Sequence, residues 1–172
     1  VKYPFSNVIL LISINPSVIF AEGFSTVASG SFSHAEGSHT EATGRDSHSE
    51  GAYNKAIGIA SHTEGEYTTA QGVGSHSEGC RTVSYGDYSH AEGRNTIASG
   101  QDSHAEGYGC KSEGAWSHAE GWNTTAKSTS HAEGYGTTSN GNGAHAEGYQ
   151  TEATSDGAHA EGYSTTSSGK GS

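Results

Sequence analysis

Small and larger side chains alternate through most of this chain with a period of seven residues. In residues 87–93, with the pattern x-x-Ser-His-Ala-Glu-Gly, positions three, five and seven are small and positions four and six are polar. Residues 94–100, with the pattern x-x-Thr-x-Ala-x-Gly, carry small residues at the same three positions. Residues two apart share one face of a β-strand. Each heptad therefore predicts a short strand with one small face, followed by a tight turn.

Two heptads form a repeat of 14 residues, which ten copies of His-x-Glu-Gly mark along the chain. Eight of the nine intervals between successive histidines are 14 residues long, and the interval from His118 to His131 is 13. A short and strict period is typical of a solenoid, whose coils stack on one another. We therefore predict an all-β fold: a parallel β-solenoid, or β-roll, of roughly ten coils with two short strands each, spaced about 4.8 Å apart.

The small face predicts a thin interior between two parallel sheets. Serine, threonine, alanine and glycine allow two strands to approach closely, and we expect the glycine at position seven to supply the turn, because glycine tolerates a positive φ. Asn54 and Cys110 replace the inward Ser or Thr at position three. Because large apolar residues are few after residue 23, the predicted stability comes from stacked backbone hydrogen bonds more than from a conventional core.

The repeat divides the chain into an apolar N-terminal segment (residues 1–16), the β-roll domain (17–169) and a short tail (170–172). Residues 17–23 form a degenerate heptad with Phe20 at the histidine position. The N-terminal segment has two interpretations. Lys2 followed by the apolar run 8–20 resembles a secretory signal, and the alternative is an apolar cap or docking segment on the first coil. The run is too short to predict a transmembrane helix.

The charge of the chain excludes two classes of partner. Its formal net charge is −11 with only 8 Lys and Arg residues. This balance argues against nucleic acid and against an anionic membrane surface, and we expect no membrane insertion of the repeat domain. Cys80 and Cys110 lie two coils apart, about 9.6 Å, which is beyond disulfide reach.

The repeat Ser-x-Ala-x-Gly-x-x-Thr-x-Ala-x-Gly resembles the YadA-like head repeat of trimeric autotransporter adhesins. It is also similar to the His-Ala-Glu-Gly repeats of phage or prophage tail-fibre and tail-spike proteins. The resemblance covers residues 17–169 and implies a left-handed roll, three chains per fibre and a role in surface attachment. The adhesin heads carry aliphatic residues where this chain has His and Glu, which favours the tail-fibre group. No neck, stalk or anchor follows residue 169, so we expect a fragment or a stand-alone rod.

The His and Glu positions hardly vary, whereas positions four and six of the other heptad vary freely, as Val27/Ser29, Glu41/Thr43 and Lys55/Ile57 show. An invariant face indicates contact with an equally regular surface, and the simplest one is the same face of identical chains around a threefold axis. A plain solvated ladder is the alternative. The predicted interface centres on His90, Glu92, His104, Glu106, His118 and Glu120.

A histidine and glutamate ladder is also a metal-ligand composition. Its histidines are His34, His48, His62, His76, His90, His104, His118, His131, His145 and His159. Residues two apart on a strand are about 7 Å apart, so a metal site needs ligands from neighbouring coils or chains. We therefore predict no cofactor and assign no metal ligand, and metal binding by this ladder stays an alternative. Ten equivalent copies offer no unique acid–base pocket, and we predict no catalytic residue and no enzyme.

An aromatic column occupies the first position after the His-x-Glu-Gly motif in the C-terminal coils, where we expect a turn. Its members are Tyr108, Trp122, Tyr135, Tyr149 and Tyr163. These residues are neighbours in the predicted stack, where they either pack from coil to coil or form a contact strip for a sugar or receptor.

Together these features predict a rigid structural rod, trimeric, in a tail fibre or surface adhesin, located outside the cell, at the cell surface or in a virion tail. Its expected partners are two further copies and a cell-surface receptor or glycan. The first alternative is a monomeric solenoid that binds a repetitive surface such as ice or a glycan. That role needs regular outward threonines, and Thr69, Thr125, Thr138 and Thr166 are interrupted by other residue types. The second alternative is a self-assembling extracellular filament.

Overall fold

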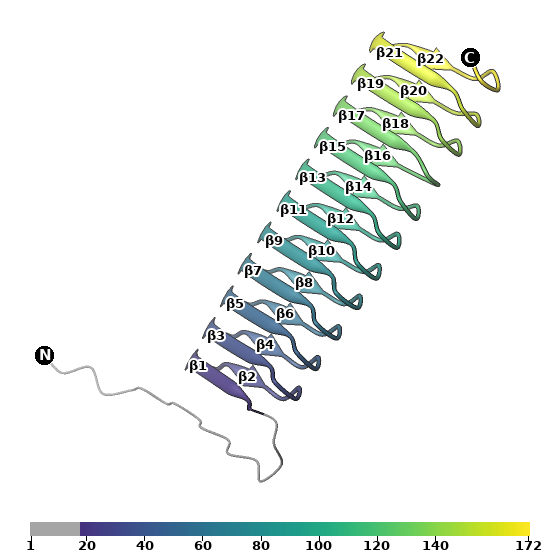
Figure 1. Ribbon diagram of the computed structural model, residues 1–172. Helices are drawn as coiled ribbons and strands as arrows, with labels where there is room; N and C mark the ends of the chain where they lie inside the picture. Colours follow the sequence, from purple (N-terminus) through teal and green to yellow (C-terminus); the bar gives the residue numbers. More distant parts are fainter. Residues whose placement is uncertain (1–17) are drawn as a thin grey trace, which may run out of the picture.

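The computed structural model describes residues 18–172, which form a straight rod of stacked coils (Figure 1). Eleven coils follow one another, and each contains one strand of five residues and one of two. The predicted parallel β-solenoid with 14-residue coils is therefore confirmed, with one coil more than the rough number expected. The predictions for residues 1–16 concern a segment outside the described residues. No helix long and apolar enough to cross a membrane occurs within residues 18–172.

The five-residue strands form one parallel sheet, which we call the long-strand sheet. Its members are β1 (Phe20–Phe24), β3 (His34–Ser38), β5 (His48–Ala52), β7 (His62–Glu66), β9 (His76–Cys80), β11 (His90–Arg94), β13 (His104–Tyr108), β15 (His118–Trp122), β17 (His131–Tyr135), β19 (His145–Tyr149) and β21 (His159–Tyr163).

The two-residue strands form a second parallel sheet, the short-strand sheet, on the other side of the coil. Its members are β2 (Val27–Ala28), β4 (Glu41–Ala42), β6 (Lys55–Ala56), β8 (Thr69–Ala70), β10 (Val83–Ser84), β12 (Ile97–Ala98), β14 (Lys111–Ser112), β16 (Thr125–Ala126), β18 (Thr138–Ser139), β20 (Glu152–Ala153) and β22 (Thr166–Ser167).

Every strand pairs with the equivalent strand of the next coil, so equivalent residues lie directly above one another. Phe20 pairs with His34, which confirms that Phe20 occupies the histidine column. The 13-residue step does not disturb this register, because His118 still pairs with His131. The missing residue falls in the turn between β16 and β17, where a shorter connection leaves both sheets intact.

The interior is the predicted layer of small side chains. In a typical coil, Ser89 and Ala91 on one side and Thr96 and Ala98 on the other are all at most 1% exposed. Most serines at position three bond to the turn before them, as where the Ser89 hydroxyl donates to the Gly86 carbonyl at 2.7 Å. The same bond recurs at Ser47, Ser61, Ser75, Ser103 and Ser117. Serine at this position therefore fills space and closes the turn before it.

Asn54 is the largest fully buried side chain, and it joins two coils. Its amide nitrogen donates to the Gly65 carbonyl at 2.9 Å, and its carbonyl oxygen accepts a bond from the Thr68 amide at 2.9 Å. Cys110, the other exception in this column, lies with its Sγ 3.2 Å from the Gly121 carbonyl oxygen. Both exceptions are thus accommodated by contacts to the next coil.

The expected role of glycine at position seven is only half correct. Gly93 has a φ of 99°, but it lies inside a long strand, half-buried rather than inward. Gly100, in the other heptad, has no positive φ; a Cβ there would lie 1.8 Å from the Gly114 carbonyl oxygen, so close coil contact requires glycine. The left-handed turn residues are instead at position two, such as Asn95 (φ 56°) and Asp102 (φ 52°). Asn and Asp tolerate this conformation best among non-glycine residues.

Candidate functional site: the histidine and glutamate face

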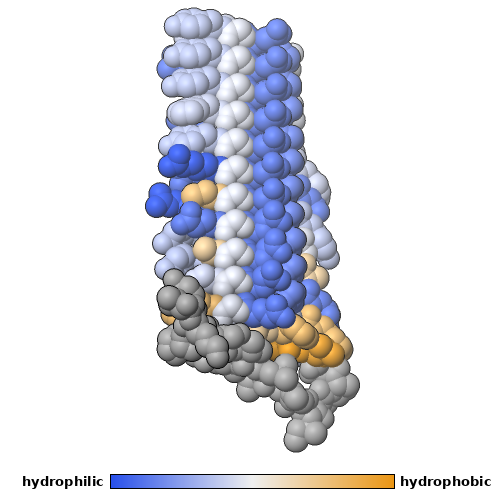
Figure 2. All heavy atoms as spheres, turned by 90° about the vertical axis from the view of Figure 1, so that its left-hand side faces the viewer, coloured by the Kyte–Doolittle hydropathy of each residue, from blue (hydrophilic) through white to orange (hydrophobic). Residues whose placement is uncertain are grey.

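The outward surface of the long-strand sheet is a column of histidines beside a column of glutamates, which we call the His/Glu face. It runs along the rod as an unbroken hydrophilic stripe (Figure 2). The strands place these side chains outward because the residues between them, such as Ala91 and Ala105, point into the interior. The six predicted interface residues lie together on β11, β13 and β15, in register from coil to coil.

The imidazole rings of this face form one continuous stack. Successive ring centroids are 4.8–5.0 Å apart, which is the spacing of the coils themselves. The rings are nearly parallel in the N-terminal coils, with 2° between His76 and His90. They tilt further along the rod, to 47° between His131 and His145. Stacked rings cover each other's faces, so each ring meets solvent mainly through its outer edge.

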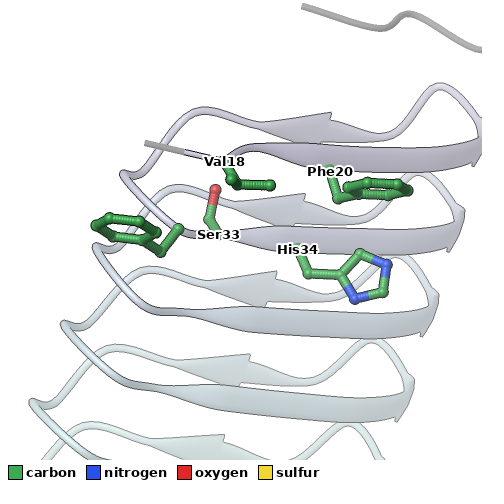
Figure 3. A pocket seen from close by; sticks show the side chains of 5 residues that line it. Val18, Phe20, Ser33 and His34 are labelled. Atoms are coloured by element: carbon green, nitrogen blue, oxygen red, sulfur yellow. The ribbon is translucent and has the colours of Figure 1, made fainter. Parts of the chain in front are cut away.

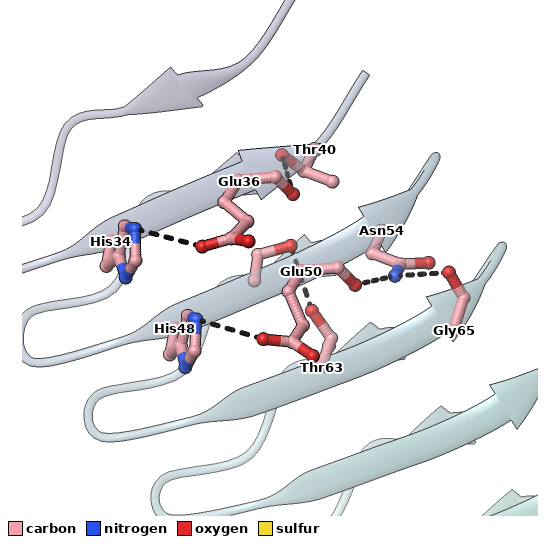
Figure 4. Close-up of polar contacts among 9 residues, drawn as sticks. His34, Glu36, Thr40, His48, Glu50, Asn54, Thr63 and Gly65 are labelled. Carbon is pink, nitrogen blue, oxygen red and sulfur yellow. Dashed lines mark hydrogen bonds and ion pairs between the residues drawn. The ribbon is translucent and has the colours of Figure 1, made fainter. Parts of the chain in front are cut away.

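Histidine and glutamate of the same coil converge, although their backbones are two residues apart. Nε2 of His34 lies 3.6 Å from a carboxylate oxygen of Glu36, and Nε2 of His48 lies 3.7 Å from Glu50 (Figure 4). Eight coils show this contact, at 3.6–4.0 Å. These distances are longer than a hydrogen bond. The two side chains are therefore neighbours without being bonded.

The histidine Nε2 atom is buried and has no hydrogen-bond partner in eight successive coils. These atoms belong to His48, His62, His76, His90, His104, His118, His131 and His145. Buried polar atoms in folded proteins nearly always have a partner. The His/Glu face therefore carries unmet bonding capacity along most of its length.

Burial keeps several of these imidazoles neutral. Loss of solvent lowers the pKa of His76 to about 4, and the neighbouring His90 and His62 lower it further in the same direction. Burial also lowers the pKa of His48, His104 and His131, again with help from adjacent histidines. Two charged rings 4.8 Å apart repel each other, and a partly desolvated ring holds its proton poorly. At these four positions the stack therefore disfavours the imidazolium form near neutral pH.

Ligand-type atoms from neighbouring coils come close together at two points of the described chain. One group is His76, Glu78 and His90, and the other is Glu92, His104 and Glu106. Within each group, one atom per residue lies within 4.8 Å of the others. This agrees with the expectation that a metal site on this face needs ligands from more than one coil.

The predicted aromatic column exists, but it belongs to the strands and not to the turns. Each member is the last residue of a long strand, as Tyr108 ends β13. The rings are stacked, at 4.3 Å between Tyr108 and Trp122 and 4.9 Å between Tyr149 and Tyr163. Because their faces cover each other, these rings present mainly edges to solvent. The geometry supports the packing interpretation, and the sugar or receptor strip stays a prediction.

A second aromatic column, not predicted from the sequence, lies one position further on in the N-terminal coils. His39 stacks on Tyr53 at 4.6 Å, and Tyr53 stacks on Tyr67 at 4.8 Å. Arginines end both columns: Arg81 lies over Tyr67 at 5.9 Å and Arg94 over Tyr108 at 5.8 Å. The signal was present in the sequence, because these aromatic residues also recur every 14 positions.

The outward face of the short-strand sheet has no such regularity. Val83 follows Thr69, and Lys111 follows Ile97, along the same column. Of the outward threonines, Thr125 and Thr138 are direct neighbours. An exposed ion pair joins Lys55 to Glu41 at 3.1 Å, and contacts of this kind contribute little.

The first coil carries a shallow apolar hollow, lined by Val18, Phe20, Phe32, Ser33 and His34 (Figure 3). Phe20 meets His34 edge-on, with ring centroids 5.8 Å apart. Phe20 and Phe32 are about half exposed, at 45% and 54%. The N-terminal end of the described rod thus exposes apolar side chains beside the histidine column.

No known family model and no curated protein matches this chain. The fold and the repeated face therefore define its class: a β-solenoid repeat protein with a histidine-rich repeat of 14 residues.

Proposed function

We propose that this chain is a rigid segment of a trimeric extracellular fibre, either a tail fibre or a surface adhesin, that mediates attachment. In this role three chains meet through the His/Glu face. The function is structural and not enzymatic, and the attached partner is a cell-surface receptor or glycan.

The observation that carries this proposal is the buried histidine Nε2 atom without a hydrogen-bond partner, which recurs in eight successive coils of the His/Glu face. A surface that repeats every coil is matched best by another surface with the same repeat. Identical chains around a threefold axis meet this condition, because each coil then faces the equivalent coils of its partners. Neutral imidazoles also favour such a contact, since they cost less to desolvate than charged ones.

The backbone architecture supports a role as a stiff spacer. Each of the eleven coils pairs in register with the next, and the ring stack sets a coil spacing of 4.8 Å. Ten such steps give a length of about 48 Å. Stacked parallel strands resist bending because every step has to keep both ladders of hydrogen bonds. A rod of this kind suits the holding of a binding element at a distance.

The decisive measurement is the mass of the protein in solution by light scattering at micromolar concentration. A trimer has a mass of about 53 kDa, three times the 17.6 kDa of one chain. A stable species near 17.6 kDa would exclude the trimer.

A matched pair of double variants tests which face makes the contact. We expect His118→Glu with His131→Glu to lower the mass to that of a single chain, because added carboxylates would meet at the axis. Thr125→Glu with Thr138→Glu alters the short-strand sheet in the same two coils, and we expect the trimer to survive. Equal loss of the trimer in both variants would argue against the His/Glu face.

The alternative of a monomeric solenoid on a repetitive surface has one observation in its favour, namely the same regular face. An ice-binding role of the outward threonines has less support, because only Thr125 and Thr138 of the four are adjacent. A monomer by light scattering would make a glycan or mineral surface the better proposal.

A further inference from the structure

We propose that the His/Glu face binds a borderline divalent cation, with Zn²⁺ as the reference ion, at two places: between β9 and β11 and between β11 and β13. The ligands are His76, Glu78 and His90 at the first place, and Glu92, His104 and Glu106 at the second. All three ligands of each set come from one chain. The inference therefore does not rest on the trimer.

The separations between ligand atoms suit a bridging cation better than a hydrogen bond. His104 Nε2 lies 3.8 Å from the Glu106 carboxylate, and His76 Nε2 lies 4.0 Å from that of Glu78. Zinc–ligand bonds of about 2.0–2.2 Å place tetrahedral ligands about 3.4 Å apart. The ligand atoms of each set lie within 4.8 Å of one another. Any two of them therefore have to approach by about 1.4 Å at most to reach the spacing of a zinc site. Rotation of a glutamate side chain provides such a movement.

The donor atoms match the chemistry of zinc and its neighbours. Imidazole nitrogen suits Zn²⁺, Cu²⁺ and Ni²⁺, whereas sites for Mg²⁺ and Ca²⁺ use oxygen alone. Nε2 of His76, His90 and His104 is buried and without a hydrogen-bond partner, so no existing bond has to break before coordination. Three protein ligands leave a fourth position for water or for a group of another molecule.

Electrostatics also favours a cation at these places. Glu92 and Glu106 are aligned in adjacent strands, and like charges in this arrangement destabilise a sheet. The whole chain has a net charge of −11, which attracts a dication further.

The two sets of ligands differ in how far their side chains have to move to coordinate one ion. A metal ion lies in the plane of the imidazole that binds it, and the rings of His76 and His90 are parallel, with 2° between them and centroids 4.8 Å apart. One of these rings has to leave the stack to share an ion. The second set has a single imidazole, His104, whose ring is already tilted by 19° and 25° from its neighbours. We therefore expect tighter binding at the second set.

The test is a calorimetric titration of the protein, produced without a histidine tag, with ZnCl₂ near neutral pH. We expect saturable binding of two ions per chain, one for each set. In the double variant His76→Phe with His104→Phe, the affinity for Zn²⁺ should fall roughly tenfold or more. Phenylalanine is the matched replacement, because Phe20 occupies this column naturally. His145 belongs to neither set, so the variant His145→Phe should bind Zn²⁺ as tightly as the unaltered protein.

Circular dichroism and melting of each variant separate lost ligands from lost structure. If the phenylalanine variant does not fold, Glu78→Gln with Glu106→Gln removes one ligand charge from each set with almost no change in shape. The inference is overturned if the protein shows no saturable Zn²⁺ binding, or if both double variants bind as well as the unaltered chain. It is also overturned if His145→Phe loses as much as they do, or if Ca²⁺ displaces Zn²⁺ at equal concentration.

Discussion

Replacement of Ala119 by leucine is expected to destabilise the rod, whereas Lys111→Leu should leave it almost unchanged. Ala119 lies on β15 and is 0% exposed, packed with Cys110, Ala126 and Ala132. Its neighbours along the column, Ala105 and Ala132, are equally buried. Lys111 lies on the outward face of β14 and is exposed. The pair therefore places a leucine once in the interior of the coil and once on its outer surface.

The magnitude follows from the space available. A leucine adds three carbon atoms, and burial of each is worth about 0.8 kcal/mol where room exists. The interior is built from alanine, serine and threonine, and the facing sheet leaves no room at Ala119. The added volume instead forces the two sheets apart, which typically costs about 1–3 kcal/mol. For a chain of this length, that corresponds to a fall of about 2–12 °C in Tm. Lys111→Leu should stay within about 0.5 kcal/mol.

Thermal unfolding followed by circular dichroism measures both variants. Ala119→Ser is the size control, because Ser77 occupies the same column naturally and is fully buried. We expect this control to melt close to the unaltered protein. A silent Ala119→Leu together with an unfolded Lys111→Leu would show that the inward and outward faces are inverted, and the proposed His/Glu contact would fall with them.

Two further predictions concern pH and backbone packing. Burial holds the pKa of His76 at about 4, below the ordinary histidine value of 6.5. The unfolded chain therefore binds more protons between these two pH values, so stability should be full above about pH 6.5 and fall as the pH drops toward 4. Melting curves from about pH 7.5 to about 4.5 check this; a constant or rising Tm would contradict it, and His76→Phe should flatten the decline. Gly100→Ala should unfold or strongly destabilise the rod, because its Cβ would lie 1.8 Å from the Gly114 carbonyl oxygen. Gly143→Ala, where φ is 63° but no atom lies within 4 Å of the added Cβ, should cost only about 1 kcal/mol in a melting experiment.

The sequence alone determined the coil and its two faces. The 14-residue period set the coil length, and the alternation of small residues assigned Ala105 and Ala119 to the interior, as observed. Even the degenerate first coil was recognisable, with Phe20 in the histidine column. These features are local: side-chain direction alternates along any strand, and an exact repeat places equivalent residues above one another. The trimer stays a prediction because it depends on contacts between chains, and the handedness of the roll stays one because it rests on a resemblance.

The tertiary structure decided which atoms meet. Residue spacing placed His104 and Glu106 about 7 Å apart, whereas their side-chain atoms lie 3.8 Å apart. The structure also places the left-handed turn residues at position two and not at the expected position seven. Gly100 is required for a different reason, its close contact with the backbone of the next coil. The shielded, unpartnered Nε2 atoms follow from stacked rings on both sides. Side-chain torsions and coil-to-coil distances determine such contacts, and a linear pattern of residue types contains neither.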